Sequence, residues 1–324
     1  MNTKVSLGFF PTPLEKLSNL SKKYPNYNIY IKRDDQTGLA TGGNKTRKLE
    51  YLMQDALLKN CNTIITAGAQ QSNHCRQTAA ACAKLNLKCH LLLGGFEPKT
   101  FTGNLLLSKQ LGATIHFTGD NRKGEDINVL EQKLIEQNLS PYIIPYGGSN
   151  LIGAMGFVNA VKELKQQLSK EKLNIDAIFF ASSSGGTQAG LQLGKQLYKL
   201  NTKLYPIAID KIELGKKQLN EIIFFIVKEG QQTLNLKDEI TIEECNLIEN
   251  YNKAGYGKVT RNERFAIETL AKTDGILLDP VYTGRAFYGM LDMLDSEKLP
   301  ANSNILFWHT GGIPASFHYS NELQ

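Results

Sequence analysis

The sequence predicts an α/β protein of two lobes, each an open, twisted and mostly parallel sheet with helices on both faces. Two observations lead to this fold class. Strand-like apolar runs alternate with amphipathic helical patterns along nearly the whole chain, as they do in successive βαβ units. The chain also has 324 residues, a length that favours two domains over a single core.

The first half of the chain shows this alternation clearly. The run 29–33 reads as a strand, and the apolar residues of 49–57 recur every three or four positions, which predicts a helix. The remaining strands of this half are expected at 63–67, 89–93, 114–117 and 142–145. Helices are expected from about 73, near 103–111 and near 127–137.

The second half continues the pattern with one interruption. Strands are expected at 175–181, 204–209 and 304–309, and helices at about 151–168, from 187, and over 261–272 and 284–294. The stretch 211–245 mixes polar and apolar residues without a clean period, so it yields no prediction. The turn-rich PYGGSN (145–150) is the best candidate for a crossing between the lobes.

Composition narrows the possible classes of function. A hydrophobic content of 41% and a charged content of 21% are typical of a globular protein, and the net charge of +6 comes without long runs of like charge. We therefore expect no nucleic-acid partner. No apolar run approaches the roughly 20 residues that span a bilayer, so no membrane partner is expected, and the first residues lack a secretory signal pattern. The five cysteines form no C-x-x-C pair, which favours reduced thiols in the cytoplasm and no metal site.

The segment TGGNKTRK (41–48) is the first of three turns that lead into a helix. It nearly matches a nucleotide-binding loop, but Asn44 separates the glycine from Lys45, so a nucleotide hydrolase is disfavoured. Lys45 lies at the predicted helix start, close to Arg47 and Lys48. Burial or neighbouring cations lower the pKa of a lysine and make it able to form a Schiff base. The alternative is a solvated lysine at the helix end.

The second turn lies within ITAGAQQSNHCRQTAA (65–80). A strand runs into small residues, and Ser72 and Asn73 then occupy the position of a helix N-cap. A free helix N-terminus carries unpaired N–H groups and a partial positive charge, which suit a carboxylate or a phosphate. The alternative is a plain cap, although a capping hydroxyl can also contact a ligand.

The third turn lies within FFASSSGGTQAG (179–190). A strand, a run of serines and glycines, and a helix follow one another, which is the arrangement of a phosphate cradle. The segment has no G-x-G-x-x-G pattern, so a single phosphate monoester fits better than a dinucleotide. A purely structural turn is the alternative. An imine-forming lysine, a site for one phosphate and a carboxylate-binding helix end together point to pyridoxal phosphate with an amino-acid substrate.

Several long motifs in one order resemble a known family. These are GGNKTRKLEYL, TAGAQQSNHCRQTAA, TGNLLL, GGSNLIGAMGF, SSSGGTQAG, GYG, LLDPVYTGRA and HTGGIPA. The chain resembles the D-cysteine desulfhydrase and 1-aminocyclopropane-1-carboxylate deaminase family, pyridoxal-phosphate enzymes of the tryptophan-synthase β fold. The resemblance implies a homodimer. We expect a large lobe formed by residues 1–46 and 155–324, and a small lobe formed by residues 47–154.

The resemblance also assigns the cofactor contacts. Lys45 of GGNK would bond covalently to the cofactor, Asn73 would hydrogen-bond its ring hydroxyl, and Thr310 of HTGG would face its pyridine nitrogen. The phosphate would be held by Ser184, Gly185, Gly186 and Thr187.

The substrate contacts follow in the same way. Ser72, with the backbone of Asn73 and His74, would hold the substrate carboxylate. Tyr256 of GYG and Tyr282 of PVYTG would line the substrate side, and the catalytic residues would be Lys45, Ser72 and these two tyrosines.

Two positions separate the activities within the family. The deaminases tend to have glutamate where this chain has Thr283, and an apolar residue where it has Thr310. A carboxylate keeps the pyridine nitrogen protonated, which ring opening needs, whereas a hydroxyl suffices for elimination of a thiolate. The two threonines therefore favour β-elimination of D-cysteine to pyruvate, ammonia and hydrogen sulfide. A deaminase, a lyase for another β-substituted amino acid such as cysteate, and a non-enzymatic pyridoxal-phosphate carrier remain alternatives, and substrate chirality stays open.

Overall fold

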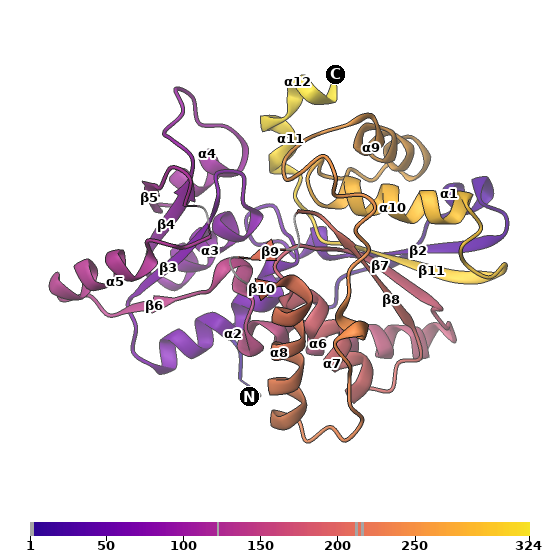
Figure 1. Ribbon diagram of the computed structural model, residues 1–324, viewed down its shortest axis with the longest axis horizontal. Coiled ribbons are helices and arrows are strands. Elements are labelled where there is room, and N and C mark those ends of the chain that lie inside the picture. Colours follow the sequence, from indigo (N-terminus) through magenta and orange to yellow (C-terminus); the bar gives the residue numbers. More distant parts are fainter. Residues whose placement is uncertain (1–2, 122, 211–212, 215–216) are drawn as a thin grey trace.

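The computed structural model describes residues 3–121, 123–210, 213–214 and 217–324. Two mostly parallel sheets organise the structure, with the four-stranded sheet on the left and the five-stranded sheet on the right of Figure 1. The strands are β1 (Leu14–Lys16), β2 (Tyr27–Arg33), β3 (Thr63–Ala69), β4 (Lys88–Gly94), β5 (Thr114–Phe117), β6 (Pro141–Ile143), β7 (Ala177–Ser182), β8 (Lys203–Ala208), β9 (Glu213–Leu214), β10 (Lys217–Gln218) and β11 (Ser303–His309).

Helices connect nearly all of these strands. The α-helices are α1 (Ser18–Lys23), α2 (Lys45–Leu58), α3 (Asn73–Leu85), α4 (Gly103–Gln110), α5 (Ile127–Glu136), α6 (Leu151–Glu171), α7 (Gly186–Leu197), α8 (Leu219–Thr233), α9 (Arg261–Asp274), α10 (Thr283–Asp295), α11 (Pro314–His318) and α12 (Ser320–Leu323). The described ranges also contain the short 3-10 helices η1 (Asp34–Gln36), η2 (Tyr146–Gly148) and η3 (Glu243–Cys245).

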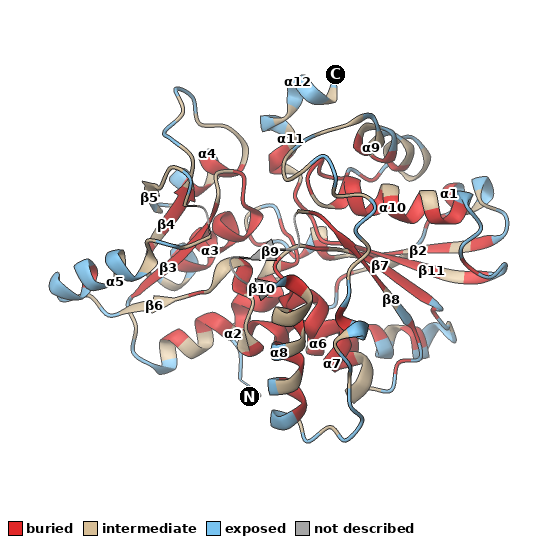
Figure 2. Cartoon of the chain, viewed as in Figure 1, coloured by how far each residue is buried: buried red, intermediate tan, exposed pale blue. Residues whose placement is uncertain are grey.

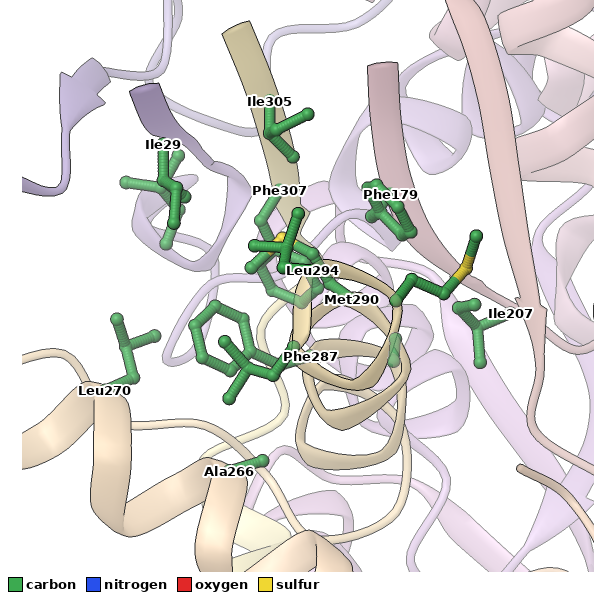
Figure 3. Close-up of a cluster of buried hydrophobic side chains, with 14 of the residues drawn as sticks. Ile29, Phe179, Ile207, Ala266, Leu270, Phe287, Met290, Leu294, Ile305 and Phe307 are labelled. Atoms are coloured by element: carbon green, nitrogen blue, oxygen red, sulfur yellow. The ribbon is translucent and has the colours of Figure 1, made fainter. Parts of the chain in front are cut away.

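The larger sheet brings together distant parts of the chain. Its order is β1-β2-β11-β7-β8, and only the β1–β2 pair is antiparallel. Strands β2 and β11 pair along their full length, so the N-terminal pair β1–β2 joins a sheet whose other strands come from the second half of the chain. Phe307 faces α9 and α10 (Figure 3), whereas the next residue, Trp308, packs with α6 on the other face. Both faces are therefore buried, as parallel sheets require.

The smaller sheet has the order β5-β4-β3-β6, and all its strands are parallel. Leu91 and Leu93 of β4 pack with α2, α3 and α4, while Leu92 faces α5. Figure 2 shows that α5 is largely exposed on its outer side, whereas α3 is buried almost throughout. Helix α3 therefore lies at the centre of the molecule, between its sheet and the rest of the chain.

The predicted fold class is confirmed, and the expected strands and helices are all present with ends shifted by a few residues. The strands and α-helices that the sequence did not reveal include β1, β9, β10, α1, α8, α11 and α12. Within the unassigned stretch 211–245, residues 211–212 and 215–216 lie outside the described residues, and the rest includes α8. All four strands of the smaller sheet fall between residues 47 and 154, but both expected lobe boundaries fall within helices, α2 and α6. The exact division remains a prediction.

A buried ionic cluster fixes the start of α2. Arg47 donates to both oxygens of Asp34 at 2.8 Å and to both oxygens of Glu163 at 2.9 Å. Lys32 donates to Glu163 at 2.5 Å, and the indole of Trp308 donates to Asp34 at 2.8 Å. Because these groups come from β2, η1, α2, α6 and β11, the cluster ties α2 to the larger sheet.

Replacing Glu163 with glutamine should lower the free energy of unfolding near neutral pH by about 1–3 kcal/mol, because charge-assisted hydrogen bonds in a buried site are lost. Although burial opposes ionisation, the hydrogen bonds and charges of Arg47 and Lys32 hold the pKa of Glu163 at about 2, below its ordinary 4.5. This stabilisation is present above pH 4.5 and is lost as the pH falls towards 2. Urea unfolding at several pH values would therefore show a smaller acid-induced loss in the variant. The exposed Glu171→Gln on the same helix is the control, and equal acid sensitivity in wild type and Glu163→Gln would contradict the assignment.

Three further findings concern the chain as a whole. None of the helices within the described ranges combines the length and the apolar character needed to cross a membrane. All five cysteines are free thiols, and only Cys61 is partly exposed. In the part of the chain that the structure describes, no three His, Cys, Asp or Glu side chains are grouped to hold a metal ion.

Candidate active site

A cavity lies where strands of both sheets end. Ser72 follows β3, Ser183 follows β7 and Thr310 follows β11, so the carboxyl ends of three parallel strands meet at this place. Ligands of open α/β sheets bind outside such strand ends. The cavity is lined by Asn44, Lys45, Ser72, Asn73, His74, Tyr146, Gly147, Ala181, Ser182, Ser183, Ser184, Gly185, Thr187, Tyr282 and Thr310.

Lys45 is the cationic side chain that reaches this cavity. Its Nζ donates to the carbonyl of Gly147 at 2.9 Å, and burial lowers the pKa of the amine to about 8. Lys48, one turn further along α2, donates to the same carbonyl at 3.1 Å but does not line the cavity. Burial and the charge of Lys45 hold the pKa of Lys48 well below its ordinary value. An amine that is partly neutral near neutral pH is able to act as a nucleophile or a base.

The N-terminus of α3 points at the same space. Ser72 is the N-cap of this helix, and its Oγ accepts a hydrogen bond from the N–H of Cys75 at 3.2 Å. Accepting this bond leaves the hydroxyl hydrogen available for a second acceptor. Ser72 can therefore cap the helix and donate to an anion at once, and the helix dipole favours that anion.

His74 lines the cavity, and one nitrogen of its ring carries no proton. The hydroxyl of Thr66 donates to the carbonyl of Ile144 at 2.8 Å, so the 2.9 Å contact with His74 Nε2 requires Nε2 to be the donor. Nδ1 then carries no proton, and it has no hydrogen-bond partner among the described residues. Burial, together with the charges of Lys45 and Lys48, holds the pKa of His74 well below its usual value, so the ring is neutral.

Asn73 is held in one orientation by the TGN motif. The amide nitrogen of Asn104 donates to the carbonyl of Gln71 at 2.9 Å and to Oδ1 of Asn73 at 2.8 Å. A carbonyl can only accept, so the Asn104 amide cannot be flipped, and Oδ1 of Asn73 is fixed as an acceptor. Nδ2 of Asn73 is thereby presented to the cavity as a donor.

The serine- and glycine-rich turn forms the third part of the site. Helix α7 starts at Gly186 without a side-chain hydrogen bond from its N-cap residue, so the N–H groups that follow Gly186 in the first turn are available to an anion. Gly185 has a φ of 85°, and a Cβ there would lie 2.7 Å from Ile223. Only glycine suits this position, where the turn packs closely against α8.

Two side chains from other segments complete this turn. Nδ2 of Asn44 donates to Oγ1 of Thr187 at 3.1 Å, which connects the start of α2 with the start of α7. Ser149 donates to Oγ of Ser184 at 2.9 Å and accepts from the N–H of Gly186 at 3.2 Å. Hydroxyl and N–H donors therefore surround the place where a phosphate would bind.

Two tyrosines meet at the cavity, and one of them, Tyr282, lines it. The hydroxyls of Tyr256 and Tyr282 lie 2.7 Å apart, and their rings meet edge to face with centroids 5.9 Å apart. Burial, followed by the neighbouring Tyr256 and Tyr146, raises the pKa of Tyr282 well above its usual value. Tyr282 therefore keeps its proton at neutral pH and can donate it.

The two positions that distinguish the activities have different surroundings. Thr310 lines the cavity, whereas Thr283 is fully buried and donates to a carboxylate oxygen of Asp279 at 2.7 Å. Of the pair, only Thr310 can meet a bound group directly. Among the described residues, no aspartate or glutamate lines the cavity.

The structure thus brings nearly all the predicted site residues into one place. Gly186 and Tyr256 do not line the cavity themselves but hydrogen-bond to residues beside it. The sequence reasoning assigned no role to Asn104, Ser149 and Tyr146, although all three belong to motifs that it noted. Gln70, which precedes the helix N-cap in the second turn, donates to the carbonyl of Phe96 outside the cavity.

The donors present suit pyridoxal phosphate. A buried amine suits an aldehyde, an uncapped helix N-terminus with hydroxyl neighbours suits a phosphate dianion, and the fixed amide of Asn73 suits a ring oxygen. Of the residues that the structure describes, one lysine and no carboxylate line the cavity, so its charge is also complementary to an anionic ligand.

Comparisons with known proteins agree with this chemistry. The family described as "Pyridoxal-phosphate dependent enzyme" matches residues 5–311. A Yersinia enterocolitica protein named D-cysteine desulfhydrase is 41% identical over 320 residues, which cover 96% of this chain and 94% of that protein. A Pyrococcus abyssi protein provisionally named 1-aminocyclopropane-1-carboxylate deaminase is 37% identical over 323 residues, covering 99% and 94%.

A solved structure described as an ACC deaminase homologue superimposes with a TM-score of 0.88 at 37% identity, covering 99% of this chain and 95% of that one. More distant structures share the fold alone, such as a threonine deaminase from Solanum lycopersicum with a TM-score of 0.66 at 20% identity over 95% of this chain and 85% of that one. The resemblance to the desulfhydrase and deaminase family is therefore confirmed. The chain belongs to the pyridoxal-phosphate dependent enzymes, and pyridoxal phosphate is its cofactor.

Proposed function

We propose that this enzyme is a carbon–sulfur lyase that converts D-cysteine and water to pyruvate, ammonia and hydrogen sulfide. The observation that carries the proposal is that Thr310, and no carboxylate among the described residues, lines the cavity. The chain thus offers the cofactor ring a hydroxyl in place of an acid. Such surroundings suit elimination of a good leaving group such as thiolate better than opening of a carbon ring. Relatives named D-cysteine desulfhydrase, at 38–41% identity, support the same choice.

We assign the cofactor contacts as follows. Bound pyridoxal phosphate supplies an aldehyde for amines and a ring that withdraws electrons from the Cα atom of an amino acid. Lys45 holds the aldehyde carbon and Asn73 donates to the ring hydroxyl. The start of α7, with Ser184, Gly185, Gly186 and Thr187, holds the phosphate.

The substrate is handled by three groups of the chain. Ser72 and the N–H groups of Asn73 and His74 bind its carboxylate at the start of α3. Lys45, when it is not bonded to the cofactor, would take the Cα proton as general base, because its pKa of about 8 leaves a fraction of the amine unprotonated near neutral pH. Tyr282 donates a proton to the departing sulfur, and Tyr256 shares that proton through their 2.7 Å contact.

The test is an assay of products from purified enzyme. Sulfide and pyruvate would be measured from D-cysteine, L-cysteine and cysteate, beside ammonia and 2-oxobutyrate from 1-aminocyclopropane-1-carboxylate. We expect sulfide and pyruvate in equal amounts from D-cysteine. Release of 2-oxobutyrate without sulfide would establish the deaminase instead, and cofactor absorbance without any turnover would indicate a carrier.

Replacing Thr187 with valine should weaken pyridoxal phosphate binding by about 1–3 kcal/mol, since a charged acceptor loses one donor in a buried site. Thr187 lines the cavity, and its hydroxyl bonds to Asn44. Equilibrium titration of the cofactor-free enzyme would measure the affinity. The exposed Thr233→Val on α8 is the matched control, and unchanged affinity in Thr187→Val would place the phosphate elsewhere.

We also propose that the enzyme is a cytoplasmic homodimer. Its free cysteines fit a reducing compartment, and the dimer is expected from the family. Light scattering of the holoenzyme would measure the mass directly, and a monomeric mass would refute the dimer.

A further inference from the structure

Tyr256 and Tyr282 lie in two separate segments that are not paired as β-strands. Tyr282 precedes α10, and its backbone N–H donates to Asp279 at 2.9 Å. Tyr256 lies 26 residues earlier in a loop, between Gly255 and Gly257, which both have positive φ angles of 87° and 69°. Glycines at such angles give a loop little intrinsic rigidity. A 2.7 Å contact between two such hydroxyls therefore needs something to hold the loop.

Arg285 makes that connection. It lies on the first turn of α10, three residues after Tyr282, and is 1% exposed. Its guanidinium donates to the carbonyl of Gly255 at 3.0 Å and to the carbonyl of Lys258 at 2.8 Å. The first of these carbonyls belongs to the peptide bond of Tyr256 itself. Arg285 therefore hydrogen-bonds to the loop on both sides of this tyrosine.

Glu263 fixes the guanidinium in turn. Its carboxylate accepts from Nε of Arg285 at 2.7 Å and, with its other oxygen, from the N–H of Thr260 at 2.8 Å. Arg285 also donates to the carbonyl of Ile209 at 2.5 Å. The planar guanidinium presents its donors in a fixed arrangement, so these acceptors define one position for the loop.

We propose that Arg285 is a positioning residue that places the Tyr256 hydroxyl against Tyr282, with Glu263 orienting it. This rests on the proposed function, in which Tyr282 donates a proton to the leaving group. Displacement of a reacting group by about 1 Å costs on the order of 10²-fold in rate. Loss of the ion pair between Arg285 and Glu263 should therefore slow proton donation to the leaving group and leave cofactor binding unchanged.

The test is a double-mutant cycle on the holoenzyme. Arg285→Met should lower kcat for D-cysteine by about 10²-fold, but in a Tyr256→Phe background it should add less than about 3-fold, because the two changes remove one function. β-Chloro-D-alanine, whose chloride leaves without a proton, should react at nearly the wild-type rate in every variant. The exposed Arg261→Met is the matched control. Arg285 would be shown only to support the fold by either of two results. One is an equal fold-loss of kcat from Arg285→Met in the wild-type and Tyr256→Phe backgrounds. The other is an equal loss of kcat with D-cysteine and with β-chloro-D-alanine.

A second measurement does not depend on activity. Ultraviolet difference titration, with the Tyr282→Phe curve subtracted, reports ionisation of Tyr282, whose pKa is raised by burial and then by Tyr256. Loosening the loop in Arg285→Met should move this titration to lower pH, and an unmoved titration would overturn the inference. Glu263→Gln, which keeps the guanidinium, serves if Arg285→Met does not fold. Tyr256→Phe and Tyr282→Phe could retain full activity while the Tyr282 titration in Arg285→Met moves to lower pH. In that case the proposed role of Tyr282 as proton donor fails, and the positioning role of Arg285 stands.

Discussion

Replacing Lys45 with alanine should abolish turnover and remove the near-visible absorbance band of the imine between the lysine and the cofactor. Lys45 is assigned both the bond to the aldehyde and the removal of the Cα proton, so its loss should lower kcat by more than about 10⁴-fold, the upper worth of a general base alone. The structure supports this choice because Lys45 lines the cavity, and burial lowers its pKa to about 8. Absorbance spectra and single-turnover assays would measure both effects.

Lys48→Ala is the matched control for this experiment. Lys48 bonds to the same Gly147 carbonyl but does not line the cavity, so its loss should leave the cofactor absorbance in place. Borohydride reduction of the wild-type holoenzyme, digestion and mass spectrometry would then locate the cofactor on one lysine. Attachment at Lys48, or loss of the absorbance in Lys48→Ala alone, would reverse the assignment.

Tyr282→Phe should lower kcat for D-cysteine by about 10²–10⁴-fold, the usual contribution of a positioned acid. The phenol is buried and its pKa lies well above the usual value, so it is protonated across the neutral range. Cofactor affinity should not change, because the hydroxyl bonds to Tyr256. Steady-state kinetics with D-cysteine and with β-chloro-D-alanine would separate proton donation from a packing effect.

The chloro substrate decides between these two roles. Chloride departs without a proton, so Tyr282→Phe should process this substrate at nearly the wild-type rate if the phenol acts only as an acid. An equal loss with both substrates would make Tyr282 a wall of the pocket. Full activity with D-cysteine would make Tyr256 the candidate donor instead.

The regular part of the fold was predictable because buried strands and amphipathic helices leave a periodic pattern. Helix α8 was not predicted, and there is a physical reason for this. Ile223 and Val227 are buried at helical spacing, but Phe224 and Phe225 add apolar residues on its other faces and obscure the stripe. Strand β1 and helix α1 have only three and six residues, too few for a period to show.

The site was predictable where a chemical group and a turn coincide in the sequence, as at Lys45. Asn104 and Ser149 were not assigned because their roles depend on partners 31 and 37 residues away along the chain. Both residues belong to motifs noted in the sequence, but a motif does not show which distant residue its side chains contact. The Tyr256–Tyr282 contact is of the same kind, since Arg285 brings the two segments together through backbone carbonyls that any sequence would provide.

The position of the cavity at the strand ends of both sheets also affects how well the chain resists proteolysis in a cell. A cofactor bound there touches α2, α3 and α7 at once, so it resists separation of the two sheets. Free cofactor at 100 times its dissociation constant adds about 2.7 kcal/mol to the free energy of unfolding. A change of that size alters the population open to proteases by roughly 100-fold. The abundance of this enzyme is therefore expected to follow the cellular supply of vitamin B6, independently of its substrate.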